Sequence, residues 1–586
     1  MLVYGDREEA EDPRFKLARL DDRLEALAAH GQGLQRHAGL VSGLIQAGEL
    51  VQGLADQAFG ARGEDAPSPA ADAAMAVCMT LARAVKGSWT SVFAGPFDPP
   101  RSALLALGRH LPATPLRIRV AEGYAFYGLY PEAYLEAALA IGRAPDARII
   151  GLRSIGAGLA AVVAAGLGAD RPITARPVGH PFQRRLSLAP ELKARLSGAA
   201  SVSAVVDEGP GLSGSSFGAA IEAIEAAGAP ARSLHLFPSH AGPPGAEASP
   251  ALRRRWPELK RHVVSFNALV LDRDDARGLE RWAVDLTGEP EAPLEDISAG
   301  AWRDRLYRHE AEWPAVWPAQ ERRKYLLRTG SGTWLLKFAG LGQDGEVKLE
   351  RAKALEAAGF GAQILGLRHG FLVQRWIDDA RPLAAGAADP DVLLPWLGRY
   401  LGFRARRFPA PPSAGADPEA LCRMTLCNAA EALGEHKAAR LEAWRRRLPR
   451  IAAMLRPVET DGRLHAWEWL HAPEGRLVKA DAVDHCRSHD LIGCQDIAWD
   501  IAGAEVELGL SEPEVEALRR RVEDESGAPV PPDSVHWLGL PYLAFQLGRC
   551  VLAAQSCADW PRESERLKAE IRRYGSLLER RIEAER

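Results

Sequence analysis

Two adjacent carboxylates between an apolar run and a glycine- and serine-rich loop constrain the fold of this 586-residue chain more than any other stretch. Residues 202–206 are mostly apolar, as in a strand at the centre of a parallel sheet. Asp207 and Glu208 follow directly, and after the loop 209–216 an alanine-rich helix is predicted over 217–226. Because open α/β sheets bind ligands at the carboxyl ends of their strands, this order of elements predicts a ligand site.

The loop has the properties of an anion-binding cradle. Its backbone N–H groups and the hydroxyls of Ser213, Ser215 and Ser216 lie at the positive end of the following helix, with little Cβ bulk to obstruct a phosphate. Asp207 and Glu208 would repel a phosphate and instead suit sugar hydroxyls, a proton or Mg²⁺. The residues predicted to hold the phosphate are Gly211, Leu212, Ser213, Gly214, Ser215 and Ser216.

An acidic pair followed by such a loop resembles the phosphoribosyl pyrophosphate (PRPP) motif of type I phosphoribosyltransferases. The resemblance implies that Asp207 and Glu208 contact the ribose hydroxyls and that residues 211–215 hold the 5-phosphate, with Ser215 where the family usually has Thr. It also implies phosphoribosyl transfer to a nucleobase or analogue, with Mg²⁺ and cations neutralising the leaving pyrophosphate. Both acids are predicted to be catalytic, and Glu208 is the candidate to take a proton from the nucleophile. The alternative is an ordinary α/β turn.

A second loop fits the same resemblance. Residues 147–152 are predicted as a strand, and the following residues Arg153, Ser154 and Gly156 open an apolar helix. This arrangement looks like the family's pyrophosphate loop, so these three residues are predicted to bind PRPP. An ordinary strand-to-helix turn is equally consistent with the residues.

For two other segments, the sequence allows two interpretations each. Residues 176–185 match the mobile hood that the family closes over pyrophosphate, with Arg184 or Arg185 meeting the leaving group, or they form a surface hairpin with solvated arginines. The loop 239–245 follows another predicted strand at the ligand edge of the sheet. It is a candidate for recognising the acceptor base, and equally a plain turn.

Short apolar runs alternate with alanine-rich helices over residues 95–290, which predicts βα units around a doubly wound, mostly parallel sheet. The fold class is therefore α/β for this phosphoribosyltransferase-like domain. Residues 1–90 are predicted to form a helical cap or interaction segment, because leucines recur at three- and four-residue spacing. The strands predicted in the central region are 116–120, 147–152, 173–177, 202–206 and 233–237.

The C-terminal part of the chain suggests a second ligand site. Residues 324–338 are predicted as a β-hairpin with Lys337 near the end of its second strand, and a helix with Glu350 follows. Residues 370–377, which include Gln374, are predicted as a further strand and hinge. This order resembles the nucleotide-binding lobe of kinase-like phosphotransferases of the aminoglycoside phosphotransferase type. The resemblance implies ATP binding, with Lys337 paired to Glu350 on the phosphates and Gln374 at the hinge.

The larger lobe of that family is matched in part. Residues 476–481 look like the strand that ends in a metal-binding aspartate, here Asp481. Residues 495–502 resemble the helix that buttresses the catalytic loop, and Asp496 and Asp500 are predicted to give that structural support. The resemblance thus predicts a two-lobed α+β domain over residues 300–586.

The catalytic loop departs from the family pattern of His-Gly-Asp with Asn five residues after the Asp. Aligned on His465, the chain has Trp467 at the position of the Asp and Ala472 at that of the Asn. Either Glu468 replaces the missing carboxylate as a catalytic residue, or the lobe binds nucleotide without efficient phosphate transfer. We expect a divergent but active phosphotransferase.

Composition sets the remaining bounds. A chain of 586 residues suggests two or three domains, and a net charge of -4 gives no argument for nucleic-acid binding. No stretch has the roughly 18 uninterrupted apolar residues of a membrane helix, and the acidic start is unlike a signal peptide. We therefore expect a cytoplasmic protein that binds neither nucleic acid nor membrane.

The cysteines give no strong signal. Seven is an odd number, and their thin spread disfavours a disulfide framework. His485, Cys486, His489 and Cys494 supply four metal-capable side chains in one short run. Structural zinc sites usually draw paired ligands from two separate places, so zinc is not favoured here.

The sequence predicts a fusion of a PRPP-dependent phosphoribosyltransferase domain with a kinase-like domain, with PRPP, a nucleobase and ATP as substrates and Mg²⁺ as cofactor. Two other classes of function remain open. One is a PRPP- or nucleotide-sensing regulator, and the other is an interaction protein that uses residues 1–90 and the kinase-like lobe as docking surfaces.

Overall fold

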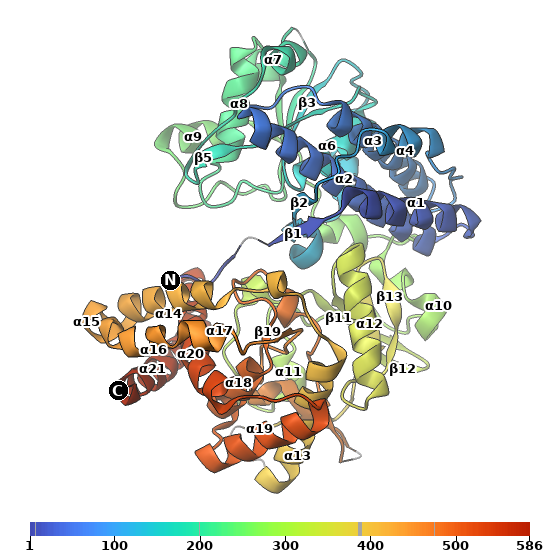
Figure 1. The fold of residues 1–586 in the computed structure, drawn as a ribbon. Coiled ribbons are helices and arrows are strands. Elements are labelled where there is room, and N and C mark those ends of the chain that lie inside the picture. Colours follow the sequence, from blue (N-terminus) through green and yellow to red (C-terminus); the bar gives the residue numbers. More distant parts are fainter. Residues whose placement is uncertain (6, 199, 385–388, 474, 586) are drawn as a thin grey trace.

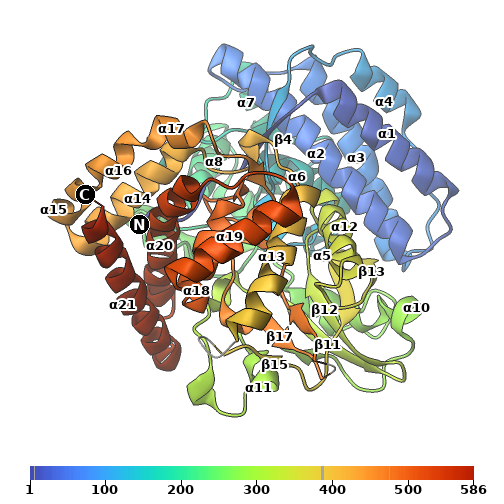
Figure 2. The same ribbon diagram turned by 60° about the horizontal axis from the view of Figure 1, so that its bottom comes forward.

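The computed structural model describes residues 1–5, 7–198, 200–384, 389–473 and 475–585. These residues form two halves, one coloured blue to green and the other green to red, that meet side by side (Figure 1). The view turned by 60° has the first helices of the chain on one side of the molecule and the last two on the other (Figure 2). The two candidate ligand sites lie in different halves.

A five-stranded parallel sheet forms the centre of the first half. Its strands lie in the order β4, β3, β7, β8, β9, and every neighbouring pair is parallel. Their bounds are β3 (Arg148–Leu152), β4 (Ile173–Ala175), β7 (Ser203–Val206), β8 (Leu234–Phe237) and β9 (Lys260–Arg261). The predicted parallel sheet is confirmed. The strand order reverses between β3 and β7, where sheets of this kind open a crevice at the carboxyl ends of their strands.

Two strands differ from the prediction. Residues 116–120 were expected in the parallel sheet, but β2 (Leu116–Arg119) pairs antiparallel with β1 (Glu8–Glu11) outside it. Its alternating buried and exposed side chains suit a ribbon with one solvated face, whereas a central parallel strand is buried on both faces. The fifth strand, β9, was not predicted, because it consists of one lysine and one arginine without an apolar run.

Helices surround the sheet, and α6 is buried along its whole length at their centre. α2, α3 and α5 pack against α6, so the helices within residues 1–90 share a hydrophobic core with the sheet. The helices are α1 (Pro13–Ala29), α2 (Leu34–Arg62), α3 (Pro69–Thr90), α4 (Arg101–Gly108), α5 (Pro131–Ile141), α6 (Gly156–Leu167), α7 (Pro190–Leu196), α8 (Ser215–Ala226) and α9 (Pro250–Arg255). A separate hairpin, β5 (Val178–His180) and β6 (Gln183–Arg185), lies over the phosphate loop.

The second half begins with a five-stranded antiparallel sheet in the order β10, β11, β12, β14, β13. The strands are β10 (Glu295–Asp296), β11 (Lys324–Thr329), β12 (Gly332–Phe338), β13 (Ile364–Arg368) and β14 (Phe371–Arg375). α12 (Gln343–Ala357) packs against β13 and β14. The predicted hairpin, helix and further strand of a small nucleotide-binding lobe therefore occur in that order.

A mostly helical lobe follows. Its main helices are α13 (Pro390–Arg407), α14 (Pro418–Leu433), α18 (Ala498–Leu508), α19 (Glu512–Ser526), α20 (Pro532–Ser556) and α21 (Pro561–Ala584). Shorter helices of this lobe are α15 (Glu435–Ala438), α16 (Glu442–Arg446) and α17 (Leu448–Ala452). Two other short helices come earlier in the chain: α10 (Val284–Thr287) before β10, and α11 (Arg303–Leu306) between β10 and β11. Short strands are β15 (Arg381–Pro382), β16 (Pro457–Val458), β17 (Trp469–His471), β18 (Leu477–Lys479) and β19 (Gln495–Asp496). No described helix is both long and apolar enough to span a bilayer.

A buried cluster of His37, Glu132 and His369 joins the two halves. Nε2 of each histidine lies 2.8 Å from Glu132 Oε1. His369 occupies the turn between β13 and β14 with φ +43°, and this turn brings its ring to α2 and α5. Burial alone would raise the pKa of Glu132, but the nearby His369 and His37 more than offset it and hold that pKa below its ordinary value. Glu132 is therefore a charged anchor shared by both halves.

The first residues of the chain also cross between the halves. The Asn428 side chain accepts a hydrogen bond from Leu2 N at 2.6 Å and donates one to Leu2 O at 2.9 Å. Leu491 N donates to Val3 O at 2.8 Å, and Val3 is buried in the core of the helical lobe. The chain thus starts on the second half before β1 joins the first.

We predict that Glu132→Gln weakens the contact between the halves. Glutamine keeps the shape of the side chain but loses the negative charge that both histidines face, so the variant should lose about 2 kcal/mol of stability. Its first thermal unfolding transition should occur several degrees below that of the wild type. Glu289→Gln is the control, because the Glu289 side chain is 71% exposed. Equal transitions in both variants would contradict this role for Glu132.

Candidate functional site

The acidic pair lines a cavity at the carboxyl edge of the parallel sheet. Asp207 and Glu208 follow β7, and Arg153 and Ser154 follow its neighbour β3, so the point where the strand order reverses brings the two loops together. The cavity, which we call the sheet cavity, has a volume of about 440 Å³. It is lined by Arg7, Arg119, Val120, Glu122, Arg153, Ser154, Ile155, Asp207, Glu208, Gly209, Gly211, Ser239 and His240.

The pKa values of both carboxyls are raised, so both keep their protons at a higher pH than an ordinary carboxyl does. Burial raises the pKa of Asp207 to about 7. Burial, together with the nearby charges of Glu122 and Asp207, raises the pKa of Glu208 to about 8. Gly123 N donates to Glu208 Oε2 at 3.1 Å, which orients that carboxyl. Two acids that titrate near neutral pH in a cavity are suited to accept or donate a proton there.

The loop after the acids has the geometry of a small-residue cradle. Gly211 and Gly214 adopt φ of +59° and +61°, a conformation that favours glycine. Among the described residues, the backbone N–H groups of Leu212, Ser213 and Gly214 have no acceptor. The Leu212 side chain is 68% exposed. The loop therefore leaves three amides available at the start of α8.

The serine hydroxyls were predicted to contact a phosphate, but two of them bond to the backbone of the hairpin. The hydroxyls of Ser213 and Ser215 donate to Pro181 O at 3.2 Å and 2.7 Å, so they tie the loop to the hairpin above it. Ser216 lies in the first turn of α8 and is half-buried. Of the loop, Gly209 and Gly211 line the sheet cavity. Main-chain groups thus supply more of the cradle than side chains do.

The β3 loop is held rigidly. The Arg153 guanidinium is buried and bonded to Asp56 at 2.9 Å and to Asp65 at 2.5 Å, so it positions the loop and is not free to grip a ligand. A Cβ atom at Gly156 would lie 2.6 Å from Val206 O, which only a glycine permits. Ser154, one of the residues predicted to bind PRPP, lines the sheet cavity.

The two predicted hood arginines lie outside the lining of the sheet cavity. Arg184 and Arg185 belong to β6, and Arg184 donates to Gly179 O at 2.8 Å within its own hairpin. Arg7 and Arg119 line the cavity instead, from the β1–β2 ribbon. No motif marks these two residues, and their position depends on a pairing between segments about a hundred residues apart, so they could not be predicted from local patterns.

A second cavity adjoins the first through Glu208 and Ser239, which line both. This neighbouring cavity has a volume of about 280 Å³. Its other walls are mainly apolar and aromatic: Tyr127, Gly128, Leu129, Tyr130, Ala133, Val264, Ser265, Phe266, Leu269 and Arg323. A polar cavity and an apolar one therefore meet at the Glu208 carboxyl.

The kinase-like half has its own charged centre around Lys337. Lys337 Nζ lies 2.7 Å from Asp481 Oδ1 and also pairs with Asp484. Lys348 on α12 completes the group at 3.1 Å from Asp484. Burial tends to lower the pKa of Lys337, but Asp481 and Asp484 outweigh it and raise that pKa above its ordinary value. The lysine and the expected metal-binding aspartate therefore meet in the cleft between the lobes.

The predicted Lys337–Glu350 pair is wrong. Glu350 lies on the solvated face of α12, with its side chain 75% exposed and 3.5 Å from Lys353. The buried face of α12 carries Lys348, Arg351 and Leu355, and each helical residue turns by about 100°, so position 350 points away from the cleft. The acidic partners of Lys337 come from the large lobe instead.

The cleft between the lobes is lined by Ile297, Trp302, Leu306, Ala315, Val316, Glu321, Lys324, Leu335, Lys337, Trp376, Arg463, His465, Trp467, Glu468, Leu470, Ala480, Asp481 and Arg549. One wall is apolar, and Lys337 and Asp481 lie on the other. Gln374 was expected at the hinge, but it lies within β14, opposite Leu335 of β12 and Ile364 of β13. Trp376, two residues later, lines the cleft.

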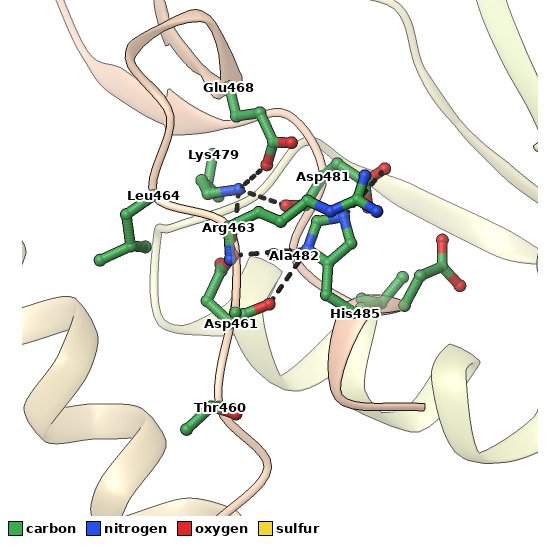
Figure 3. Close-up of polar contacts among 12 residues, drawn as sticks. Thr460, Asp461, Arg463, Leu464, Glu468, Lys479, Asp481, Ala482 and His485 are labelled. Carbon is green, nitrogen blue, oxygen red and sulfur yellow. Dashed lines mark hydrogen bonds and ion pairs between the residues drawn. The ribbon is translucent and has the colours of Figure 1, made fainter. Parts of the chain in front are cut away.

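The loop at residues 459–468 is held by buried charges (Figure 3). Asp500 accepts hydrogen bonds from Asp461 N at 2.7 Å and Gly462 N at 2.8 Å. Lys479 bonds Glu468 and lies 3.4 Å from Asp461. Asp496 accepts from Arg456 N at 2.7 Å and from Ala498 N at 2.9 Å. Asp496 and Asp500 thus support the backbone around the loop.

The geometry favours a different alignment of this loop. Gly462, fixed by Asp500, corresponds to the glycine of the His-Gly-Asp pattern, so Arg463 stands at the position of the Asp. Five residues later comes Glu468, at the position of the Asn. An alignment that starts from His465 places both positions four residues too late, whereas an alignment that starts from Gly462 finds them. Glu468 lines the cleft and is bonded to Lys479 beside Asp481.

The four residues considered for zinc do not converge on one point in the described part of the chain. His485 instead belongs to a buried group with Asp461 and Glu468, and His489 contacts Glu122 at 2.9 Å. Cys494 Sγ contacts Cys486 O at 3.7 Å, and both cysteines are buried.

No protein-family model and no curated protein matches the chain. Solved structures of small-molecule kinases resemble part of it. Choline kinase LicA from Streptococcus pneumoniae is 15% identical over 43% of this chain and 89% of its own, with a TM-score of 0.32. Macrolide 2′-phosphotransferase type I is 13% identical over 52% of this chain and 98% of its own, with a TM-score of 0.31. Spectinomycin phosphotransferase APH(9)-Ia, solved with ADP and spectinomycin, is 11% identical over 52% and 98%, with a TM-score of 0.32. These are partial likenesses of fold.

We predict that Asp207→Asn plus Glu208→Gln changes the pH dependence of stability. The pKa values of about 7 and about 8 lie above those of unfolded carboxyls, so between roughly pH 4 and pH 8 the folded protein holds protons that the unfolded chain has lost. Raising the pH through this window therefore destabilises the wild type. The double variant should lose less stability than the wild type between pH 5 and pH 9 in thermal unfolding experiments. Parallel curves for the two proteins would contradict the raised pKa values.

Proposed function

We propose that the first half is a PRPP-dependent phosphoribosyltransferase and that the second half binds Mg-ATP. The observation that carries the first part is the position of Asp207 and Glu208, at the reversal point of a parallel sheet and beside a loop with open backbone amides. Sugar hydroxyls suit the two acids, and a 5-phosphate suits the amides. One ligand with hydroxyls and phosphates satisfies both groups at once.

The two joined cavities support transfer to a flat acceptor. With PRPP in the sheet cavity, a nitrogen heterocycle in the apolar cavity would face the ribose across Glu208. The bond from the anomeric carbon to the pyrophosphate oxygen breaks, its electron pair leaves with pyrophosphate, and the ring nitrogen supplies the pair for the new bond. Glu208 in its ionised form then accepts the proton that the ring nitrogen loses. A carboxyl with a pKa of about 8 holds such a proton well.

The residues present fit a divalent cation, because Asp207 and Glu208 offer the carboxylate oxygens that Mg²⁺ prefers. Bound there with PRPP, Mg²⁺ would neutralise charge on the pyrophosphate. The residues of the chain bind the sugar, orient it and take the proton. Arg7 and Arg119 bring positive charge to the same cavity.

We predict that Asp207→Asn plus Glu208→Gln abolishes base-dependent pyrophosphate release from PRPP while the fold is kept. Release is measured with a panel of nucleobases, alongside isotope exchange between PRPP and pyrophosphate. The matched control is Asp170→Asn plus Glu258→Gln, two exposed acids of the same half. Turnover that survives in the double variant of the site would remove the PRPP assignment. Tight PRPP binding by the wild type without release or exchange would instead support a PRPP-sensing regulator.

The proposal for the second half is nucleotide binding with weak or altered phosphate transfer. Lys337 and Asp481 supply the phosphate and metal contacts of a nucleotide site, and the apolar wall of the cleft suits a base. Arg463 at the position of the catalytic Asp removes the carboxylate that would take the proton from an acceptor hydroxyl. Such a change slows ordinary phosphate transfer and leaves nucleotide binding possible.

We predict that Lys337→Ala and Asp481→Ala each weaken Mg-ATP binding by about tenfold or more, because each removes a charged contact worth roughly 1.5–3 kcal/mol. Isothermal titration calorimetry on the full chain measures this. Lys353→Ala is the control, since the Lys353 side chain is 49% exposed on the solvated face of α12. Equal affinities in all of these proteins would contradict nucleotide binding in the cleft.

A further inference from the structure

The cleft of the kinase-like half continues into another cavity, which we call the arginine cavity. Glu321, Lys324, Arg463, Asp481 and Arg549 line both. The arginine cavity is completed by Val3, Tyr4, Trp317, Gln320, Arg322, Asp484, His485, Ser488, His489, Asp490 and Phe545. Asp481 lines both the cleft and the arginine cavity, so a molecule in the arginine cavity would lie next to nucleotide phosphates bound at Asp481.

The acidic side chains of the arginine cavity already have partners. Glu321 pairs with Lys324 at 2.7 Å, and Asp481 and Asp484 both pair with Lys337. Asp490 accepts hydrogen bonds within its own turn, from Ser488 Oγ, from Ile492 N at 3.1 Å and from Gly493 N at 3.3 Å. Its carboxylates are thus engaged by lysines or by backbone.

Two arginines of the cavity are different. Among the described residues, the guanidinium groups of Arg463 and Arg549 have no hydrogen bond or ion pair, although each is partly buried. Arg463 comes from the loop at residues 459–468, and Arg549 from α20. Burial, together with the positive charge of Arg463, lowers the pKa of Arg549. Figure 3 draws Arg463 extending from its loop beside Asp481 and His485. Glu321 of the same cavity attracts both arginines from a distance but bonds to neither guanidinium, so an anion between them would be the direct partner of both.

A third group in the wall also lacks a partner. Trp317 is only 7% exposed, and no acceptor for its indole Nε1–H exists among the described residues. A buried N–H without an acceptor costs free energy, which a ligand oxygen would recover. Trp317 lines the same cavity as the two arginines. Arg463, Arg549 and Trp317 are thus three donors without an acceptor, and two of them carry positive charge.

We propose that the arginine cavity binds a small phosphomonoester, with its phosphate on Arg463 and Arg549. A phosphate has several acceptor oxygens and about two negative charges, which matches paired guanidinium donors and a nearby N–H group. The proposal extends the proposed nucleotide-binding function, because the bound molecule would lie next to the nucleotide phosphates as a second substrate or effector. A nucleoside 5′-phosphate, the type of product that phosphoribosyl transfer yields, belongs to this chemical class.

The test uses ribose 5-phosphate with the full chain, and ribose as its neutral counterpart. Hydrogen–deuterium exchange, followed as a titration, reads residues 313–322 and 459–468 separately from residues 207–218, which report the sheet cavity. We expect ribose 5-phosphate, and not ribose, to protect residues 313–322 and 459–468. Arg463→Gln and Arg549→Gln should each raise the concentration for half-protection by about 10- to 100-fold, in line with the loss of a charged hydrogen bond.

The controls separate this proposal from the others. Arg549→Lys keeps the charge and should retain most of the binding, which guards against a variant that simply misfolds. Arg520→Gln removes an arginine whose side chain is 70% exposed on α19 and should change nothing. Asp207→Asn plus Glu208→Gln should leave protection of residues 313–322 intact. Comparison with ATP binding separates the two proposals. If the wild type binds ATP no better than Lys337→Ala but shows the arginine-dependent protection, only the nucleotide proposal fails.

Protection by ribose equal to that by ribose 5-phosphate, or protection that is unchanged in both glutamine variants, would overturn the phosphomonoester assignment. Protection confined to residues 207–218 would do the same, because the phosphate would then bind in the sheet cavity alone.

Discussion

The close approach of α6 to the sheet is the constraint on which the first site depends. A Cβ at Gly151 would lie 2.2 Å from Gly156 O, and one at Gly156 would lie 2.6 Å from Val206 O. Glycine at both positions lets the start of α6 sit directly on β3 and β7. The loops after these strands are then adjacent, and the acids after β7 open into the same cavity as Ser154. Without that contact, two ordinary turns would remain where a ligand cavity now exists.

One short segment physically connects the two sites. The segment Gly123–Tyr127 donates its first N–H to Glu208, and its last side chain, Tyr127, lies 2.5 Å from His489 Nδ1. His489 in turn lies 2.9 Å from Glu122, which lines the sheet cavity. Arg322 donates to Phe126 O at 2.7 Å. Any ligand that moves Glu208 or the loop after Asp481 therefore acts on a segment that both halves hold.

The sequence predicted what is local and missed what depends on tertiary contacts. Asp207, Glu208 and the parallel sheet could be predicted because a strand, its carboxyl-end residues and the following helix are contiguous. Glu350 was assigned wrongly because its helix carries charges on both faces, and the residues that turn inward, Lys348 and Arg351, look as polar as those that turn outward. Arg7 and Arg119 were missed because they reach the cavity only through the β1–β2 pairing.

The loop at residues 459–468 shows a second limit of prediction from sequence: the alignment with a family pattern depends on which residue is matched first. A histidine is conspicuous in sequence, whereas the significance of Gly462 depends on its φ of +76° and on the Asp500 carboxylate that receives its N–H. When Gly462 is aligned with the glycine of the His-Gly-Asp pattern, the next residue is Arg463, a cation at the position of an aspartate. A carboxylate there would take a proton from a neutral hydroxyl; an arginine there attracts an anion. Arg549, on the distant helix α20, brings a second positive charge to the same cavity. Two separate elements, the loop at residues 459–468 and α20, therefore add positive charge to the cavity.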